Sequence, residues 1–181
     1  MLDGGPCRLA GASAIALARS ARFGRAKDTG LAMTALSRRI GGILAALPLA
    51  PGLRVLEVGC GPGALAHAIA ARVGTGHVLG IDRSPRAIAQ AVAGSAEAMA
   101  SGCLSFRHDS AEDFELAPGE TPFDLIVAVR VGALDGRHPA AGARAWLSLN
   151  AALAPAGRVF VDGVEVLRGP GASDEGAMPP P

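Results

Sequence analysis

From residue 53 onward, short apolar runs alternate with segments whose apolar residues recur every three or four positions. Runs of about four to eight residues rich in aliphatic and β-branched side chains are typical of strands. They predict strands at 54–58, 77–81, 104–108, 123–129 and 158–162. The run at 123–129 is the most continuously apolar, which is typical of a strand covered on both faces. Strands that alternate with helices predict an α/β domain with a mainly parallel sheet.

The segments between these runs have the spacing of amphipathic helices. Ser84 is a favourable N-cap and Pro85 suits the first helical position, so a helix is predicted to begin there. A short polar helix or turn is expected at 110–114. The residues predicted to face inward are Leu65, Ile69 and Val73 in the first helix, Ile88 and Val92 in the second, and Trp146, Leu149 and Leu153 in a third over 140–154.

The two ends of the chain differ in composition from this central part. Apolar residues recur at helical spacing over 33–47, before Pro48 and Pro51 interrupt the chain, and a shorter helix is expected at 8–20. The segment 169–181 contains four prolines and little apolar content, so we expect disorder there, as in residues 1–7. These observations predict an N-terminal helical extension (1–50), a central domain (51–168) and a disordered tail (169–181).

The run Val55–Gly63 joins the first predicted strand to its helix through three glycines at alternate positions. Residues without a Cβ let the chain turn tightly and let a ligand approach the backbone, so Gly59, Gly61 and Gly63 indicate a cofactor loop of the nucleotide type. The pattern Gly59-x-Gly61-x-x-Ala64 also satisfies the dinucleotide fingerprint, so the loop alone leaves the cofactor open.

Carboxylates near the strand ends narrow the choice of cofactor. Glu57 would repel a pyrophosphate but suits a ligand that carries an ammonium and a sulfonium. Asp82 follows the second strand, where a carboxylate can accept both ribose hydroxyls; Arg83 beside it would suit a 2′-phosphate, which Asp82 opposes. Asp109, after the third strand, is a candidate acceptor for an adenine amine or an N-cap. A nicotinamide cofactor is therefore the less favoured alternative.

These motifs, in order and spacing, resemble those of class I S-adenosylmethionine-dependent methyltransferases over about residues 50–165. The resemblance implies a three-layer Rossmann-like sandwich, with a sheet of about five strands in the order 3-2-1-4-5 and helices on both faces. The segments that carry it are Val55–Gly63, Gly80–Pro85, Asp109–Phe114, Phe123–Val127 and Leu153–Val159.

The resemblance also assigns roles to individual residues. It implies that Glu57 and the loop residues Gly59, Cys60, Gly61 and Gly63 hold the methionine end of S-adenosylmethionine. Asp82, followed by Arg83, would hold the ribose, and Asp109, Ser110 and Ala111 the adenine edge. Arg130 would begin the loop after the fourth strand, beside the sulfonium.

The loop 130–139 is the expected place for groups that act on the methyl acceptor. His138 is the candidate base for a hydroxyl acceptor, and Arg137 could anchor a carboxylate or a phosphate. An Asn/Asp-Pro-Pro-Tyr signature after the fourth strand is absent, which disfavours an adenine or glutamine target. The predicted activity is methyl transfer to a small molecule, and a non-catalytic cofactor-binding module is the alternative.

Composition limits the other partners. The net charge is +1, 3% of residues are aromatic and there is no tyrosine, so a nucleic-acid partner is not expected. No apolar stretch has the length of a membrane span, and no cysteine or histidine spacing predicts a metal site. Three cysteines, an odd number, favour a reducing cytoplasm over a disulfide framework.

The end of the predicted sheet is the point where the resemblance weakens. Related enzymes usually add two strands after the fifth, whereas Val164–Val166 offers only an extension of that strand or a short returning stub. We therefore expect the edge of the fifth strand to be covered by a homodimer contact or by the N-terminal helices.

Overall fold

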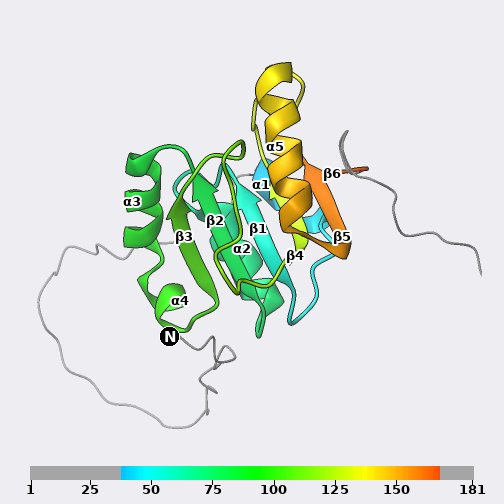
Figure 1. Cartoon of the computed structure of the whole chain (residues 1–181). Helices are drawn as coiled ribbons and strands as arrows, with labels where there is room; N and C mark the ends of the chain where they lie inside the picture. The colour runs from blue at the N-terminus through cyan, green and yellow to red at the C-terminus, as the bar shows by residue number, and fades with distance from the viewer. Residues whose placement is uncertain (1–37, 168–181) are drawn as a thin grey trace, which may run out of the picture.

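The computed structural model describes residues 38–167, which form one six-stranded sheet with helices on both faces (Figure 1). The strands lie in the order β3-β2-β1-β4-β5-β6, and only β6 runs antiparallel to its neighbour. The elements are α1 Arg38–Ala46, β1 Arg54–Val58, α2 Ala64–Val73, β2 His77–Asp82, α3 Pro85–Gly94, α4 Ala96–Ala100, β3 Leu104–His108, β4 Phe123–Ala128, α5 Pro139–Ala152, β5 Leu153–Val161 and β6 Val164–Val166.

Each face of the sheet carries its own apolar core, because successive strand residues point to opposite faces. Val55, Val78 and Leu125 pack with α1 and α2 on one face. Leu56 and Ile126 pack on the other face with α5 and with the segment that follows β3. In Figure 1, α5 lies in front of the sheet and α1 and α2 lie behind it. The predicted three-layer sandwich and the strand order 3-2-1-4-5 are confirmed.

The parallel register brings the carboxyl ends of four strands to one edge. Val58 at the end of β1 pairs with Ile81 of β2 and with Ala128 of β4. The chain leaves β1 toward β2 and β3 on one side and reaches β4 and β5 on the other, so the strand order reverses beside β1. Ligands of open α/β sheets bind at such a switch point.

One prediction about local structure needs correction, and two others can be compared with the described residues. Val92 is 39% exposed, because the inward face of α3 is formed around the buried Ala91 instead. Residues 110–114 form a turn, one of the two predicted alternatives, in which Ser110 Oγ accepts a hydrogen bond from the backbone N–H of Asp113 at 3.2 Å. The helix predicted over 33–47 is described from Arg38, while residues 33–37, the helix at 8–20 and the tail 169–181 lie outside the described residues.

The last two strands also differ from the predicted ranges. β5 begins at Leu153, directly after α5, and its pairing with β4 shifts register between Phe123 and Leu125. A left-handed Asp162, with φ 51°, then turns the chain into β6, which pairs antiparallel with β5. Val164–Val166 is therefore the returning stub, and β5 is covered on that side by three residues of the chain itself.

The aromatic ring of Phe106 on β3 packs against two glycines near the cofactor-type loop. A Cβ built on Gly80 would lie 2.7 Å from Phe106 Cδ1 and 3.1 Å from Cys60 Cβ. We expect Gly80→Ala to lower the free energy of unfolding by about 1–3 kcal/mol, the usual cost of overpacking a core. Denaturant unfolding of the two proteins measures this difference.

Two further variants make this prediction specific. Phe106→Leu in the Gly80→Ala background should recover part of the loss, because the added methyl would then have room. Gly42→Ala, in α1 with no atom within 4 Å of the added Cβ, should be neutral or stabilising. Equal destabilisation by Gly80→Ala and Gly42→Ala would contradict the packing explanation.

Candidate functional site

A cavity of about 450 Å³ opens at the carboxyl ends of β1, β2, β3 and β4, where the strand order reverses. Its wall combines the end of β1, the residues after β2 and β3, the loop after β4 and the first turn of α5. The lining residues are Val58, Gly59, Ile81, Asp82, Arg83, Asp109, Ser110, Ala111, Glu112, Val129, Arg130, Val131, Gly132, Ala133, Arg137, His138 and Ala141.

The glycine loop between β1 and α2 has the backbone that its sequence predicts. Gly59, Gly61 and Gly63 have φ values of 72°, 54° and 83°, which strongly favour residues without a Cβ. The N–H groups of Gly59 and Cys60 both donate to the Ile81 carbonyl, at 2.8 and 2.9 Å, and fix the loop against β2. Of the predicted loop residues, Gly59 lines the cavity, whereas Cys60, Gly61 and Gly63 lie behind it.

Asp82 connects this loop to the start of α3. One carboxylate oxygen accepts from the Gly61 N–H at 2.9 Å and the other from the Ser84 N–H at 2.8 Å. A carboxylate oxygen can accept more than one hydrogen bond, so Asp82 keeps acceptor capacity toward the cavity that it lines. A carboxylate held in this way fits a pair of hydroxyl groups.

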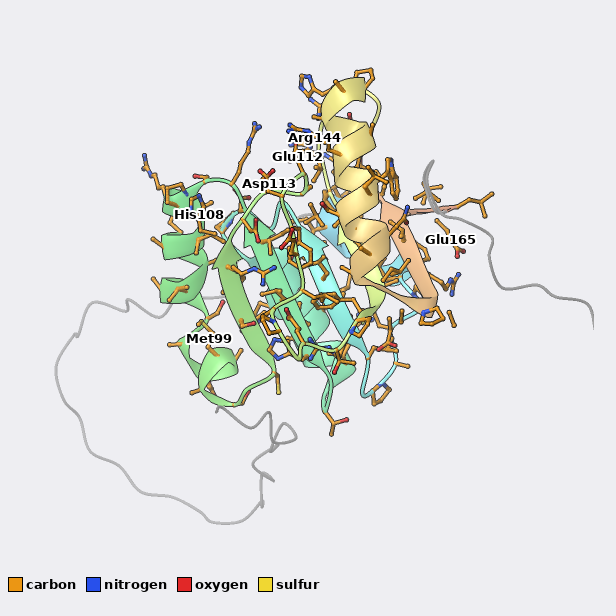
Figure 2. The ribbon with its side chains drawn as sticks, in the orientation of Figure 1. Met99, His108, Glu112, Asp113, Arg144 and Glu165 are labelled. Carbon is orange, nitrogen blue, oxygen red and sulfur yellow. The ribbon has the colours of Figure 1, made fainter. Side chains whose placement is uncertain are left out.

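The predicted adenine-edge residues, Asp109, Ser110 and Ala111, also line the cavity. Asp109 accepts from the Ser110 N–H at 2.9 Å and pairs with Arg107 Nε at 3.1 Å. The neighbouring Glu112 is fixed to α5, because its carbonyl accepts from Ser148 Oγ at 3.1 Å. Figure 2 shows Glu112 and Asp113 near the upper part of α5, above the sheet.

Glu57 lies beneath the glycine loop and does not line the cavity. It is 2% exposed and shares the strand face of Val55, toward α2, where it accepts a hydrogen bond from the Ala66 backbone. Burial, with a smaller contribution from the charge of Asp82, raises the pKa of Glu57 to about 8, although the Ala66 hydrogen bond lowers it. Its Oε2 has no hydrogen-bond partner among residues 38–167. The resemblance implies that Glu57 holds the methionine end of the cofactor, and this role stays a prediction; in the structure the side chain is buried and turned toward α2.

The loop after β4 brings Arg130, Arg137 and His138 into the cavity wall. The His138 N–H donates to the Gly132 carbonyl at 3.1 Å, and a Cβ on Gly132 would lie 2.8 Å from His138 Cδ2. Asp135 pairs with Arg137 at 2.7 Å, and this partner lowers the pKa of the Asp135 carboxyl. The predicted loop residues therefore meet at one side of the cavity.

Several lining residues were missed by sequence reasoning. Val129, Val131 and Ala133 form apolar parts of the wall, and Gly132 gives room to the imidazole. Phe106 does not line the cavity but supports it from behind, since its ring lies 2.8 Å from the position of a Cβ on Gly63. The sequence shows a glycine in the loop after β4 and an aromatic residue on the third strand. Neither residue type indicates by itself which side chain it packs against.

The two cysteines in the described part of the chain differ. Cys60 is a free thiol, and burial, together with the charges of Glu57 and Asp82, raises its pKa to about 12. Such a thiol is a poor nucleophile. Cys103 is disulfide-bonded, whereas the odd number of cysteines favoured a reducing cytoplasm over a disulfide framework.

A switch-point cavity with a glycine loop after β1 and a carboxylate at the end of β2 that is held by that loop defines a Rossmann-like nucleotide-cofactor protein. The family model for the methyltransferase domain matches residues 49–164, which is more than half of the chain. The chain belongs to this family, as the motifs predicted, and S-adenosylmethionine is the cofactor that the family and its structural neighbours indicate.

Individual relatives agree with this assignment. A trans-aconitate 2-methyltransferase from Streptomyces avermitilis is 34% identical over 94 residues, which are 51% of this chain and 34% of the relative. An S-adenosylmethionine-dependent methyltransferase from Geobacter sulfurreducens, in complex with S-adenosyl-L-homocysteine, matches with a TM-score of 0.55 and 26% identity over 69% of this chain and 47% of its own. Another from Thiobacillus denitrificans, with the same ligand, matches at 0.54 and 25% over the same shares. The chain thus spans about a third of the curated relative and about half of these structures.

No helix within 38–167 is long and apolar enough to cross a membrane. The same residues contain no group of three histidine, cysteine or carboxylate side chains arranged to hold a metal ion.

Proposed function

We propose that this chain transfers a methyl group from S-adenosylmethionine to a small-molecule acceptor by in-line displacement. The observation that carries this proposal is the cavity itself, in which Asp82 is fixed to the glycine loop on one side and the loop after β4 forms the opposite wall. The relative from Streptomyces avermitilis, named for trans-aconitate, supports a small acceptor. A homodimer and a cytoplasmic location stay predictions from the sequence.

The residues present fit this cofactor. Gly59 has a left-handed backbone at the cavity wall, where a Cβ would lie 2.8 Å from Val131 Cγ2. We assign the methionine end to the Gly59–Gly63 loop, the ribose to Asp82 with Arg83 beside it, and the adenine edge to Asp109, Ser110 and Ala111. The backbone of Arg130 would lie beside the sulfonium, with its side chain toward the acceptor. Glu57 and Cys60 support the loop from within the fold.

The cofactor, when bound, would supply a methyl group already activated on a sulfonium: the acceptor lone pair would bond to the methyl carbon in line as the carbon–sulfur bond breaks and S-adenosylhomocysteine leaves. The chain therefore has mainly to orient the acceptor and exclude water. Val129, Val131 and Ala133 provide the apolar surface for exclusion. His138 lines the same wall, where it would accept the proton that a hydroxyl acceptor must lose.

His138→Gln tests this proton-accepting role. For a hydroxyl acceptor we expect kcat to fall by about 10²–10⁴, the usual contribution of a positioned base, while the affinity for S-adenosylhomocysteine stays unchanged. Steady-state kinetics and calorimetry measure the two quantities. An unchanged kcat with such an acceptor would remove His138 from the mechanism.

The proposed function is tested by incubating the protein with methyl-labelled S-adenosylmethionine and a panel of small hydroxyl, amine and carboxylate compounds. We expect label in one acceptor class and an equal amount of S-adenosylhomocysteine. Binding of S-adenosylhomocysteine without transfer to any compound would favour the non-catalytic module instead.

A further inference from the structure

The charged side chains around the cavity are divided between its two sides. The carboxylates are Asp82, at the end of β2, and Asp109 and Glu112, after β3; Arg83 follows Asp82. On the other side, residues 129–141 contribute two guanidinium groups and no carboxylate to the lining. The first side carries the residues assigned to ribose and adenine, so the acceptor must approach from the second.

The second side is held in shape by its own backbone. The N–H groups of Leu134 and Asp135 both donate to the Val131 carbonyl, at 2.9 and 3.1 Å. A Cβ on Gly132 would lie 3.6 Å from Arg137 Nη2 as well as 2.8 Å from the His138 ring, so this glycine lets both side chains close over the loop. Arg137 Nη2 also donates to the Arg130 carbonyl at 3.4 Å.

Arg130 is fixed from outside the loop. Its φ of 57° is left-handed, which is disfavoured for a residue with a Cβ, and its N–H donates to Asp162 Oδ1 at 3.2 Å. The same oxygen accepts from Arg39 Nη2 of α1 at 2.8 Å. Asp162, which follows β5, therefore contacts both α1 and the residue that begins the loop after β4. These contacts hold the Arg130 backbone in its conformation.

The loop carries more positive than negative charge. Asp135 pairs with Arg137, whose side chain is 61% exposed, and exposed pairs of this kind are weak. Within residues 38–167, no carboxylate forms an ion pair with the Arg130 guanidinium. Of the two guanidinium groups in this wall, only that of Arg137 forms an ion pair with a carboxylate among the described residues.

We infer that this wall selects an acceptor that carries an anionic oxygen group, a carboxylate or a phosphate, bound by Arg130 and Arg137. The planar fork of a guanidinium matches either group with paired hydrogen bonds. Asp162 is the positioning residue, because it holds Arg130 in the conformation that lines the cavity. The inference rests on the proposed methyltransferase function and names the substrate class of the same site.

The test uses the complete chain saturated with S-adenosylhomocysteine, titrated calorimetrically with propane-1,2,3-tricarboxylate, its uncharged triamide and inorganic phosphate. We expect the tricarboxylate or phosphate to bind and the triamide not to bind, and the stronger of the two anions identifies the group. Arg137→Ala and Arg130→Ala should each weaken the anion at least tenfold, with S-adenosylhomocysteine affinity changed by less than threefold. Asp162→Ala should weaken the anion, whereas Asp162→Asn, which keeps an acceptor for the Arg130 N–H, should retain most of its affinity.

Arg144→Ala is the matched control, since Arg144 is an exposed residue of α5 outside the cavity lining, labelled in Figure 2. It removes one positive charge near the loop and should leave anion binding unchanged. Equal binding of the triamide, no binding of either anion, or an equal loss from Arg144→Ala would overturn the inference. So would arginine variants that lose S-adenosylhomocysteine in parallel, since the guanidinium groups would then bind the cofactor. Failure of the wild-type chain to bind S-adenosylhomocysteine at all would instead count against the proposed function.

Discussion

Asp82→Ala is expected to weaken the binding of S-adenosylhomocysteine by roughly a hundredfold. The variant loses the acceptor proposed for the ribose hydroxyls, and a hydrogen bond to a charged group contributes about 1.5–3 kcal/mol. It also releases the Gly61 and Ser84 N–H groups, which Asp82 holds at 2.9 and 2.8 Å, so the glycine loop loses its connection to α3. Isothermal titration calorimetry measures the change in Kd.

A control must separate this effect from general destabilisation. Asp124, near the amino end of β4, is exposed and accepts from the Arg54 N–H at 2.9 Å, so Asp124→Ala also removes a carboxylate that holds a backbone amide. It lies at the opposite end of the sheet from the cavity, and its variant should bind S-adenosylhomocysteine normally. An Asp82→Ala affinity within threefold of the wild type would reject the ribose assignment.

Glu57→Gln is expected to change how stability depends on pH. The pKa of Glu57 is about 8 in the folded chain, against 4.5 for an unperturbed glutamate, because the side chain is buried. Between these values the folded chain retains a proton that the unfolded chain has lost, so this residue makes stability fall as pH rises. The slope is about 1.4 kcal/mol per pH unit at most. Glutamine has no proton to lose, so the variant should become progressively more stable relative to the wild type from about pH 5 to pH 8.

Denaturant unfolding at several pH values measures the difference between the two slopes, in which the contributions of all other groups cancel. Glu97→Gln, at an exposed position of α4, is the matched control and should give a curve parallel to the wild type. A parallel curve for Glu57→Gln would mean that Glu57 titrates normally in the folded chain.

The strand boundaries show how much of the fold could be predicted from local sequence patterns. The apolar runs located β1 and β3 to the residue and β2 to within one, because an alternating, β-branched segment next to a glycine or an N-cap has few other structures available. β5 was predicted five residues too short at its start. Its beginning at Leu153 depends on pairing with Phe123 of β4, and its sequence includes Pro155 and Gly157, which locally oppose a strand.

The inward faces of helices depended on their neighbours. Periodicity alone allowed Val92 as an inward residue of α3, but the helix packs on the sheet through Ala91. The Phe106 ring already fills the space beside Gly63 and Gly80, so only a small side chain fits between the helix and the sheet. The turn at 110–114 has a similar explanation. Between the predicted alternatives of a helix and a turn, local bonding favours the turn, because the Asp113 backbone N–H donates to Ser110 Oγ at 3.2 Å instead of to a helical carbonyl.

The sequence by itself determined the class of fold and the family, and it proposed the residues for the cofactor, because glycine spacing, strand-end carboxylates and alternation are local properties that the chain carries in order. The tertiary structure decided which of these residues line the cavity. It moved Glu57 beneath the loop, since strand alternation turns its side chain toward α2. It also joined Asp162 to Arg130 and Arg39, residues 32 and 123 positions away, because only the packing of β4, β5 and α1 brings these groups together.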